Sequence, residues 1–436
     1  MREMKDSGLK WVGEVGVDCS FVPLKYFLES KDAVKVGPFG SQLSGNDFSD
    51  DVTDYWVYNQ RTVIDNEYET GNAYIQKEKF DSMASFHVHA DDILITTRGT
   101  IGKISKVPCG HKKGVLHPCI IRFRIDPKKY CYKLLEIIFN SSDFVTRQII
   151  YKSNATTIEV IYSDTLRNII LPYYEYERQE QIADYLEKQC NSFNALIADI
   201  QSQIEALEEY KRSVITEAVT KGLDPDVEMR DSGIAWVGDI PAHWITHPLY
   251  FYFGERKNKN ALGLETNLLS LSYGKIIRKD INSNGGLLPE SFNTYNIIEK
   301  DDIIIRPTDL QNDKRSLRTG IAREHGIITS AYIAMKAIKS VNPEYFHYLL
   351  HAYDVMKVFY NMGNGVRQGL NFSEFSRLMV FEPTIEEQNA IVAYLKEKCD
   401  EIDLAIAEKK QQIETIEEYK KSLIFEYVTG KKEVQA

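Results

Sequence analysis

The stretch that decides the fold is QEQIADYLEKQCNSFNALIADIQSQIEALEEYKRSVITEAVT, residues 179–220, because it recurs later in the same chain. Residues 388–429, QNAIVAYLKEKCDEIDLAIAEKKQQIETIEEYKKSLIFEYVT, match it at a constant offset of 209. The match pairs Leu186 with Leu395, and the motif Glu-Glu-Tyr-Lys stands at the same place in both copies. A repeat of this length indicates a duplicated structural element.

Both copies have the heptad pattern of a coiled coil. Apolar residues step by four and three, with an average period of 3.5, and no Pro or Gly interrupts the pattern. Pro172 and Pro383 precede the copies, and Gly222 and Gly430 follow them, as expected at helix ends. We predict two long helices of about 43 residues and about 65 Å each, paired as an antiparallel coiled coil. The alternative is that each helix packs only on its own domain.

The heptad pattern also defines the seam of this coiled coil. Lys211 and Lys420 occupy seam positions, where their stems can pack while their charges reach solvent or a partner. The main apolar seam positions are Leu186, Phe193, Ile197, Ile200, Ile204, Leu207, Val214, Leu395, Ile402, Ile406, Ile413, Ile416 and Leu423.

A second repeat gives the domain order. Residues 4–13, MKDSGLKWVG, recur as residues 229–238, MRDSGIAWVG. Between the repeats lie two regions of similar size and different sequence that mix short β-rich runs with short helices, so we expect two α/β (α+β) globules. Each copy runs short motif, globule, Pro and long helix, which predicts a pseudo-two-fold, pseudo-circular chain whose two ends meet. The predicted segments are a repeat motif 1–16, globule 17–171, spacer helix 172–222, linker with repeat motif 223–240, globule 241–382, spacer helix 383–430 and tail 431–436.

The net charge of −10 is unevenly distributed. Residues 175–221 carry 10 acidic and 5 basic side chains, and residues 383–430 carry 11 and 6, so the acidity concentrates in the helices. Residues 98–133, by contrast, hold ten Lys and Arg against the single acid Asp126. Such a cluster is a candidate for contacts with nucleic-acid phosphates, although a solvated loop has the same composition.

The composition places the chain among globular proteins without membrane spans. It is 43% hydrophobic and 11% aromatic, and it has neither an uninterrupted apolar run of membrane-spanning length nor a secretory signal at its N-terminus. We therefore expect a cytoplasmic protein. The six cysteines form no CxxC pair and indicate no disulfide framework.

Two clusters contain residue types that occur in catalytic or metal sites. One cluster holds the potential zinc ligands Cys109, His111, His117 and Cys119, but their spacing matches none of the common zinc modules. We therefore interpret these side chains as buried or incidental and expect no metal. His87 and His89 beside Asp92 offer a general base, yet they alternate as residues of a half-exposed strand do. The chain has no Gly-x-Gly-x-x-Gly, no Walker loop and no Asn/Asp-Pro-Pro-aromatic run. No catalytic residue is predicted.

These motifs resemble the specificity subunit of Type I restriction-modification enzymes. The resemblance rests on the two DSG-x-x-WVG motifs, on the helix ends EEYKRSVITEAVTKG (208–222) and EEYKKSLIFEYVTGK (417–431), and on VGPFGS (36–41), RGTIG (98–102) and LLSLS (268–272). It covers essentially the whole chain. The second globule departs from the pattern, because Arg306-Pro307-Thr308-Asp309 stands where Arg-Gly-x-x-Gly would align.

The resemblance implies a non-catalytic subunit that recognises DNA. In that family each globule is a target-recognition domain that reads one half of a bipartite double-stranded site, and the helices set the spacing and dock two methyltransferase subunits. Those subunits use S-adenosylmethionine, and restriction subunits that use ATP and Mg join them; no cofactor is expected in this chain. The alternative is a non-enzymatic coiled-coil scaffold whose two domains bind ligands other than DNA.

Residue chemistry nominates the contacts that such a domain would make. Lys and Arg suit phosphates, glycines allow close backbone approach, Gln and Asn suit adenine, and Arg suits guanine. The phosphate candidates are Arg98, Gly99, Gly102, Lys103, Lys106, Lys112 and Lys113 in the first globule and Lys275, Arg278, Lys314, Arg315 and Arg318 in the second. The base candidates are Gln42, Asn59, Gln60, Arg61, Arg367 and Gln368.

Overall fold

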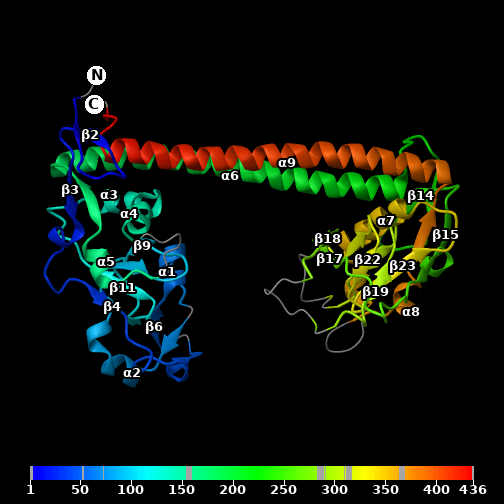
Figure 1. The fold of residues 1–436 in the computed structure, drawn as a ribbon, viewed down its shortest axis with the longest axis horizontal. Coiled ribbons are helices and arrows are strands. Elements are labelled where there is room, and N and C mark those ends of the chain that lie inside the picture. Colours follow the sequence, from blue (N-terminus) through cyan, green and yellow to red (C-terminus); the bar gives the residue numbers. More distant parts are fainter. Residues whose placement is uncertain are drawn as a thin grey trace. The chain divides into compact units, whose positions relative to one another are not determined.

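The computed structural model of this chain forms two compact units. Unit 1 comprises residues 1–200 and 410–436, and unit 2 comprises residues 201–409. Each unit contains one α/β globule and a segment of each of two long helices (Figure 1). The structure describes residues 3–51, 54–71, 73–153, 160–281, 289, 291–308, 310, 317–362 and 369–434.

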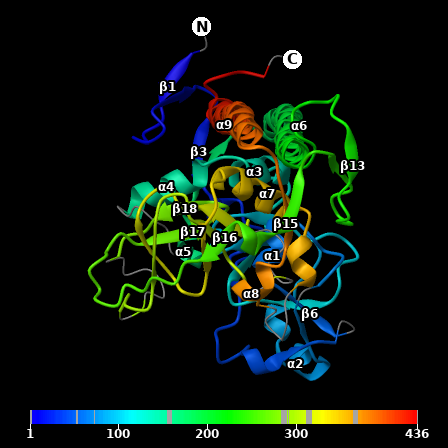
Figure 2. The same cartoon turned by 90° about the vertical axis from the view of Figure 1, so that its right-hand side faces the viewer.

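The two long helices are α6 (Tyr176–Lys221) and α9 (Ile385–Val428). They run antiparallel, because residue numbers rise along one as they fall along the other. In unit 1 the ring centres of Tyr185 and Tyr427 lie 4.5 Å apart, and those of Phe193 and Tyr419 lie 5.6 Å apart. Figure 2 views the helices end on, side by side. The apolar positions named above for the seam are all buried or half-buried.

Three lysines at the helix pair each meet a polar side chain of the opposite helix. In unit 2 the ammonium of Lys211 donates to both carboxylate oxygens of Asp403 at 2.7 Å, and Lys409 donates to Gln203. In unit 1 Lys420 donates to the Asn194 side-chain oxygen at 2.7 Å. Polar contacts at a seam favour one register over its alternatives, since a shift by one heptad would separate each pair.

The repeated DSG-x-x-WVG motif folds as the same hairpin in both places. In unit 1 it joins β1 (Met4–Asp6) to β2 (Glu14–Gly16), and the Asp6 carboxylate accepts the Gly8 amide at 3.0 Å. In unit 2 it joins β13 (Met229–Asp231) to β14 (Asp239–Pro241), where Asp231 accepts from Gly233 at 2.9 Å. The amide of Gly16 donates to Thr429 at the end of α9, so the two chain ends meet as predicted (Figure 1).

The globule of unit 1 is built on two four-stranded sheets. One is antiparallel, in the order β4 (Lys35–Val36), β11 (Ile120–Phe123), β8 (Ile93–Thr96) and β9 (Ile104–Lys106). The other runs β10 (Gly114–Leu116), β6 (Tyr55–Tyr58), β7 (Tyr74–Ile75) and β5 (Phe48–Ser49), with β10 parallel to β6. The remaining elements are β3 (Ser20–Pro23), β12 (Ile170–Tyr173), α1 (Gln60–Asp65), α2 (Lys77–Ser82), α3 (Tyr132–Asn140), α4 (Phe144–Ser153), α5 (Ser163–Arg167) and the 3-10 turns η1 (Leu24–Tyr26), η2 (Gly45–Asp47) and η3 (Ala84–Phe86).

The globule of unit 2 repeats this plan with a different sequence. Its four-stranded antiparallel sheet has the same order, β16 (Phe253–Glu255), β23 (Ile333–Ala337), β20 (Ile303–Ile305) and β21 (Thr319–Ile321). In both units a two-stranded pair, β3 with β12 or β15 with β24, leads into the long helix. The other elements are β15 (Ile245–Pro248), β17 (Leu269–Ser272), β18 (Lys275–Arg278), β19 (Asn296–Ile298), β22 (Gly326–Ile328), β24 (Met379–Glu382), α7 (Pro343–Val355), α8 (Phe372–Phe375), η4 (Leu249–Phe251) and η5 (Val358–Asn361).

The core of each unit is continuous with the helix pair. In unit 1 one cluster of buried residues joins Ile95 and Phe123 of the sheet to Leu186 and Ile424 of the helices. In unit 2 the equivalent cluster joins Ile305 to Val214 and Leu395. Each globule is therefore anchored to the helices by apolar burial, the main stabilising contribution to folding. None of the described helices is both long and apolar enough to cross a membrane.

Two histidines of α7 make the stability of the chain depend on pH. Burial lowers the pKa of His347 to about 3 and that of His351 to about 4. Below pH 6.5 the unfolded chain protonates both residues while the folded chain keeps them neutral. The free energy of unfolding should therefore fall as the pH drops from 6.5, by at most about 1.4 kcal/mol per pH unit for each histidine.

Urea denaturation of the full chain at pH 7.5 and pH 5.0 measures this dependence. We expect a lower midpoint at pH 5.0, and a smaller difference in the double variant His347→Gln, His351→Gln. A double variant with the same pH difference as the unsubstituted chain would show that these histidines are not its source.

Candidate nucleic-acid interface

In unit 1 the candidates Gln42, Gln60, Arg98, Gly99 and Gly102 gather at one edge of the sheet β4-β11-β8-β9, whereas Lys106 ends β9 and Lys112 and Lys113 precede β10, away from this edge. Because β4 and β8 both run antiparallel to β11, their carboxyl ends reach the same edge, where β9 and β11 begin. The loops after β4 and β8 meet the segment before β11 there: the Gly37 amide donates to Ile120 at 2.9 Å and the Thr97 amide to Cys119 at 3.1 Å. A Cβ on Gly37 would lie 2.1 Å from the His117 carbonyl oxygen, so this close approach requires glycine.

The loop 97–103 between β8 and β9 is the centre of this edge. Gly99 and Gly102 have φ values of +64° and +81°, which favour glycine. The side-chain amide of Gln60 donates to the Arg98 carbonyl at 2.6 Å, and this contact brings the start of α1 to the loop. The fold thereby places Asn59, Gln60, Arg98 and the two glycines together, although they are far apart in sequence.

Some polar residues near the start of α1 make structural contacts, and others are exposed to solvent. The Asn59 side chain caps α1 by accepting the amides of Arg61 and Thr62. Arg61 is exposed and makes an ion pair with Asp65 at 3.3 Å. In the loop after β4, the Gln42 side-chain oxygen accepts the Phe39 amide at 3.0 Å. Asn59, Gln60 and Gln42 therefore shape the edge through contacts with backbone groups.

The predicted phosphate contacts of unit 1 differ in their accessibility. Arg98, Lys112 and Lys113 are exposed, and the ammonium of Lys112 lies 5.4 Å from the centre of the Trp56 ring. Lys106 is paired with Asp91 at 3.2 Å. Lys103 is half-buried and donates to the Asn140 carbonyl; burial lowers its pKa, with the charges of Lys420 and Lys421 acting in the same direction. Arg98, Lys112 and Lys113 are thus the most accessible of these cations, and of the three only Arg98 lies in the loop 97–103.

A buried aspartate anchors the strand that carries the loop. Asp92 precedes β8, is fully buried, and accepts from Arg124 at 2.6 Å, from Arg122 at 3.4 Å and from the His89 amide at 2.7 Å. In unit 2 Asp302 precedes β20 and accepts from Arg256 at 2.9 Å and the Glu299 amide at 2.8 Å. The sequence presents Asp92 as part of a possible hydrolytic site with His87 and His89, whereas the structure gives it a positioning role. The sequence signal of that role is the repeated Asp-Asp-Ile at 91–93 and 301–303.

The loop between β20 and β21 in unit 2 is the structural counterpart of loop 97–103. Its ends make the same backbone bonds: the Arg306 amide donates to Arg318, as that of Thr96 does to Lys103. The Leu370 amide donates to Pro307 at 3.0 Å, as that of Ile161 does to Thr97 at 3.0 Å. The two loops are therefore equivalent, an equivalence that the Arg-Pro-Thr-Asp sequence had concealed.

The candidates of unit 2 are only partly described. Lys275 is exposed, and Arg278 is exposed and paired with Glu324. Arg318 has no exposed surface; its guanidinium donates to the Thr308 carbonyl inside the globule, so it holds the loop and does not face solvent. The other four candidates lie outside the described residues, namely Lys314, Arg315, Arg367 and Gln368.

The side chains considered above as zinc ligands or as a general base contact neighbouring residues of their own globule. His117 accepts the Cys119 amide at 3.1 Å, and burial lowers its pKa. The His111 ring lies within 3.2 Å of the Pro108 carbonyl and 3.1 Å of the Val88 carbonyl, and His87 stacks on Phe80 at 3.9 Å. Among the described residues no group of three or more His, Cys, Asp or Glu side chains is arranged to hold a metal.

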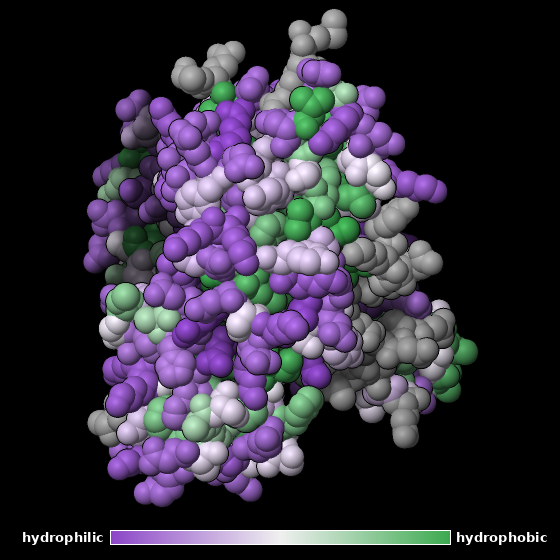
Figure 3. All heavy atoms as spheres, turned by 90° about the vertical axis from the view of Figure 1, so that its left-hand side faces the viewer, coloured by the Kyte–Doolittle hydropathy of each residue, from purple (hydrophilic) through white to green (hydrophobic). Residues whose placement is uncertain are grey.

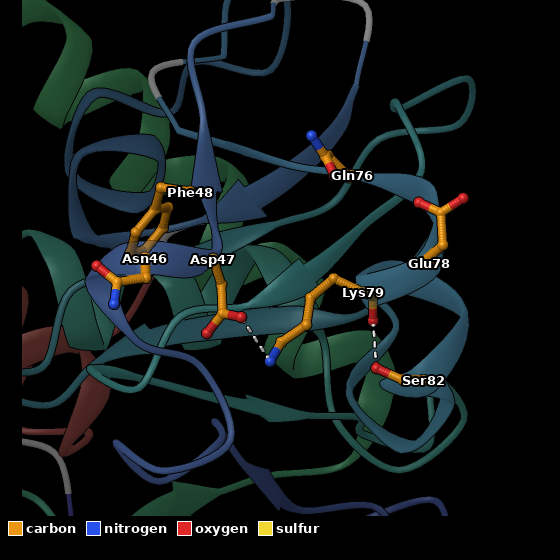
Figure 4. Close-up of a pocket in the computed structure, with 7 residues that line it drawn as sticks. All are labelled: Asn46, Asp47, Phe48, Gln76, Glu78, Lys79 and Ser82. Carbon is orange, nitrogen blue, oxygen red and sulfur yellow. Dashed lines mark hydrogen bonds and ion pairs between the residues drawn. The ribbon is translucent and has the colours of Figure 1, made fainter.

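A hollow in unit 1 is closed by its own charges. It is lined by Asn46, Asp47, Phe48, Gln76, Glu78, Lys79 and Ser82 (Figure 4). Lys79 lies 2.9 Å from Asp47, whose pKa is lowered to about 2 by the Ser44 backbone amide and then by Lys79. The ion pair between Lys79 and Asp47 therefore connects α2 to η2 across this hollow. On the face shown in Figure 3 hydrophilic residues predominate and hydrophobic ones form small islands.

The fold has a counterpart among solved structures. A chain from a solved structure of a type I restriction-modification system, described as bearing on complex assembly and conformational transition, matches with a TM-score of 0.65. The match covers 95% of this chain and 98% of the other at 14% identity, a level that shows the fold alone.

The sequence comparisons find similar proteins of one kind. The family model for the Type I restriction modification DNA specificity domain matches residues 43–206. Two curated specificity subunits of Methanocaldococcus jannaschii are similar: putative MjaX, 24% identical over 96% of this chain and 95% of its own length, and MjaVIII, 23% identical over 92% and 93%. The chain therefore contains a Type I restriction modification DNA specificity domain, and curated specificity subunits of Type I restriction enzymes are similar to it over nearly its whole length. The scaffold alternative finds no support.

The buried aspartates give the first test of how the interface is held. We expect Asp92→Asn to lower the free energy of unfolding by about 2–4 kcal/mol, because Arg122 and Arg124 would lose their buried counter-charge. Asp91→Asn is the matched control: Asp91 is exposed with φ of 65°, a conformation that Asn tolerates. Urea denaturation of the full chain measures both, and equal losses for the two variants would remove the anchoring role from Asp92.

Proposed function

We propose that each globule reads one half of a bipartite DNA site through the sheet edge that carries the loop 97–103 or its counterpart after β20. What supports this proposal is that two globules of different sequence share one strand order and one set of loop attachments. A shared frame with different loops suits an asymmetric split site, because base contacts must differ while the presentation of the loops stays the same.

In this proposal each segment of the repeated sequence has its own function. Residues 17–171 and 241–382 are the two target-recognition domains, and the spacer helices 172–222 and 383–430 set the distance between half-sites. The acidic helices repel DNA and are free to bind two methyltransferase subunits, which would bring S-adenosylmethionine. Restriction subunits would add ATP and Mg, and the assembly would act in the cytoplasm.

The residues proposed to meet DNA in unit 1 follow from their exposure. Arg98, Lys112 and Lys113 are the proposed phosphate contacts, with Gly99 and Gly102 allowing backbone approach. Gln42 and Arg61, which are both exposed, are the proposed base readers. In unit 2 Lys275 takes the phosphate role.

The salt dependence of DNA binding tests this proposal. Each phosphate contact that is lost reduces the slope of log affinity against log salt by about 0.9. We expect the triple variant Arg98→Ala, Lys112→Ala, Lys113→Ala, assembled with the methyltransferase subunits, to bind its site more weakly and with a slope reduced by about 2–3. The double variant Lys188→Ala, Lys410→Ala, on the exposed faces of the helices, is the control and should leave the slope unchanged. An unchanged slope in the triple variant would contradict the proposal.

A further inference from the structure

A tyrosine occupies the tip of the hairpin β17–β18 in unit 2. Ser272 pairs with Lys275, so Tyr273 and Gly274 alone form the turn. Their φ values are +45° and +78°, as a type I′ turn requires. Such turns favour Asn-Gly, Asp-Gly or Gly-Gly, because a bulky side chain is strained at positive φ. Tyr273 is therefore a residue that the turn itself disfavours.

The fold makes no evident use of the Tyr273 ring. The residue is 78% exposed, and among the described residues no aromatic ring or cation stacks on it. A strained residue whose side chain is not buried contributes little to stability, so another role has to account for it.

Tyr273 lies near the edge of unit 2 at which the loop between β20 and β21 lies. The neighbouring Gly274 packs against the loop between β20 and β21, where a Cβ would lie 3.1 Å from a Leu317 methyl. Lys275, the next residue, is exposed. The turn that carries Tyr273 thus lies beside Leu317, at the end of the loop proposed to read DNA, and Lys275 follows it in the chain.

Unit 1 presents an aromatic ring at its own edge by another loop. Phe39 follows β4 and is 75% exposed. Its turn is held by two hydrogen bonds with Gln42, one from the Phe39 amide to the Gln42 side chain and one from the Gln42 amide to the Phe39 carbonyl at 2.7 Å. Each unit therefore presents an exposed aromatic ring on a constrained turn at its polar edge, which indicates that both units use such a ring.

We propose that Tyr273 stacks on a nucleobase of the bound duplex, as a wedge at one base step of the half-site that unit 2 reads. Aromatic side chains stack on bases of any sequence, and inserted side chains unstack a step and bend the duplex. The strained turn holds the ring outward in advance, so little side-chain freedom is lost on binding. This inference rests on the proposed function and adds a specific contact to it.

The test compares Tyr273→Asn, Tyr273→Phe and Tyr250→Asn in the chain assembled with its methyltransferase subunits. Tyr250, exposed on η4 of the same unit, is the matched control. Tyr273→Asn relieves the turn, so the melting temperature of the chain should stay level or rise by about 2–4 °C. Site-specific affinity should nevertheless fall roughly 5- to 150-fold, as loss of one base–aromatic stack predicts. Tyr273→Phe and Tyr250→Asn should bind as the unsubstituted chain does.

Fluorescence of 2-aminopurine placed along the half-site gives a second readout. With the unsubstituted chain and Tyr273→Phe, the signal should change at one step on binding, and with Tyr273→Asn it should not. Unchanged affinity and fluorescence in Tyr273→Asn would overturn the wedge, as would a lower melting temperature or loss of a methyltransferase subunit. If the unsubstituted complex bound no DNA site at all, the proposed function itself would fail.

Discussion

The pairing of α6 with α9 is the contact on which the rest of the chain depends, because the core of each unit runs into it. Leu186 and Ile424 belong to the core of unit 1, and Val214 and Leu395 belong to that of unit 2. A register shift in the helix pair would disturb both cores at once. The contact between Lys211 and Asp403 and the other polar pairs oppose such a shift.

The two globules on these helices show how one frame can carry two specificities. The sheet order, the buried aspartate before the central strand and the attachments of the following loop are the same in both units. The loops differ: unit 1 has glycines at 99 and 102, whereas unit 2 places Pro307 near the start of its loop. Stability and recognition are thereby assigned to different residues, so the loops can vary while the frame persists.

Sequence alone predicted the elements that have a regular period and missed those that depend on tertiary contacts. The antiparallel helices follow from the heptads, and the meeting of the chain ends follows from the repeats. The sequence predicts a phosphate contact for Arg318, and this prediction is wrong because Arg318 is buried; a buried and an exposed Arg look the same in sequence. The equivalence of the two loops required backbone contacts such as Leu370 to Pro307, and the strain at Tyr273 required its φ value.

Mapping methylated adenines in cells tests the central claim, the separation of spacing from reading, most directly. Seven residues would be inserted into α6 within 193–207 and seven into the facing part of α9, within 405–419, so that the seam keeps its register. The account predicts a methylated motif with both half-sites unchanged and a different gap between them. Altered half-sites with an unchanged gap would contradict it.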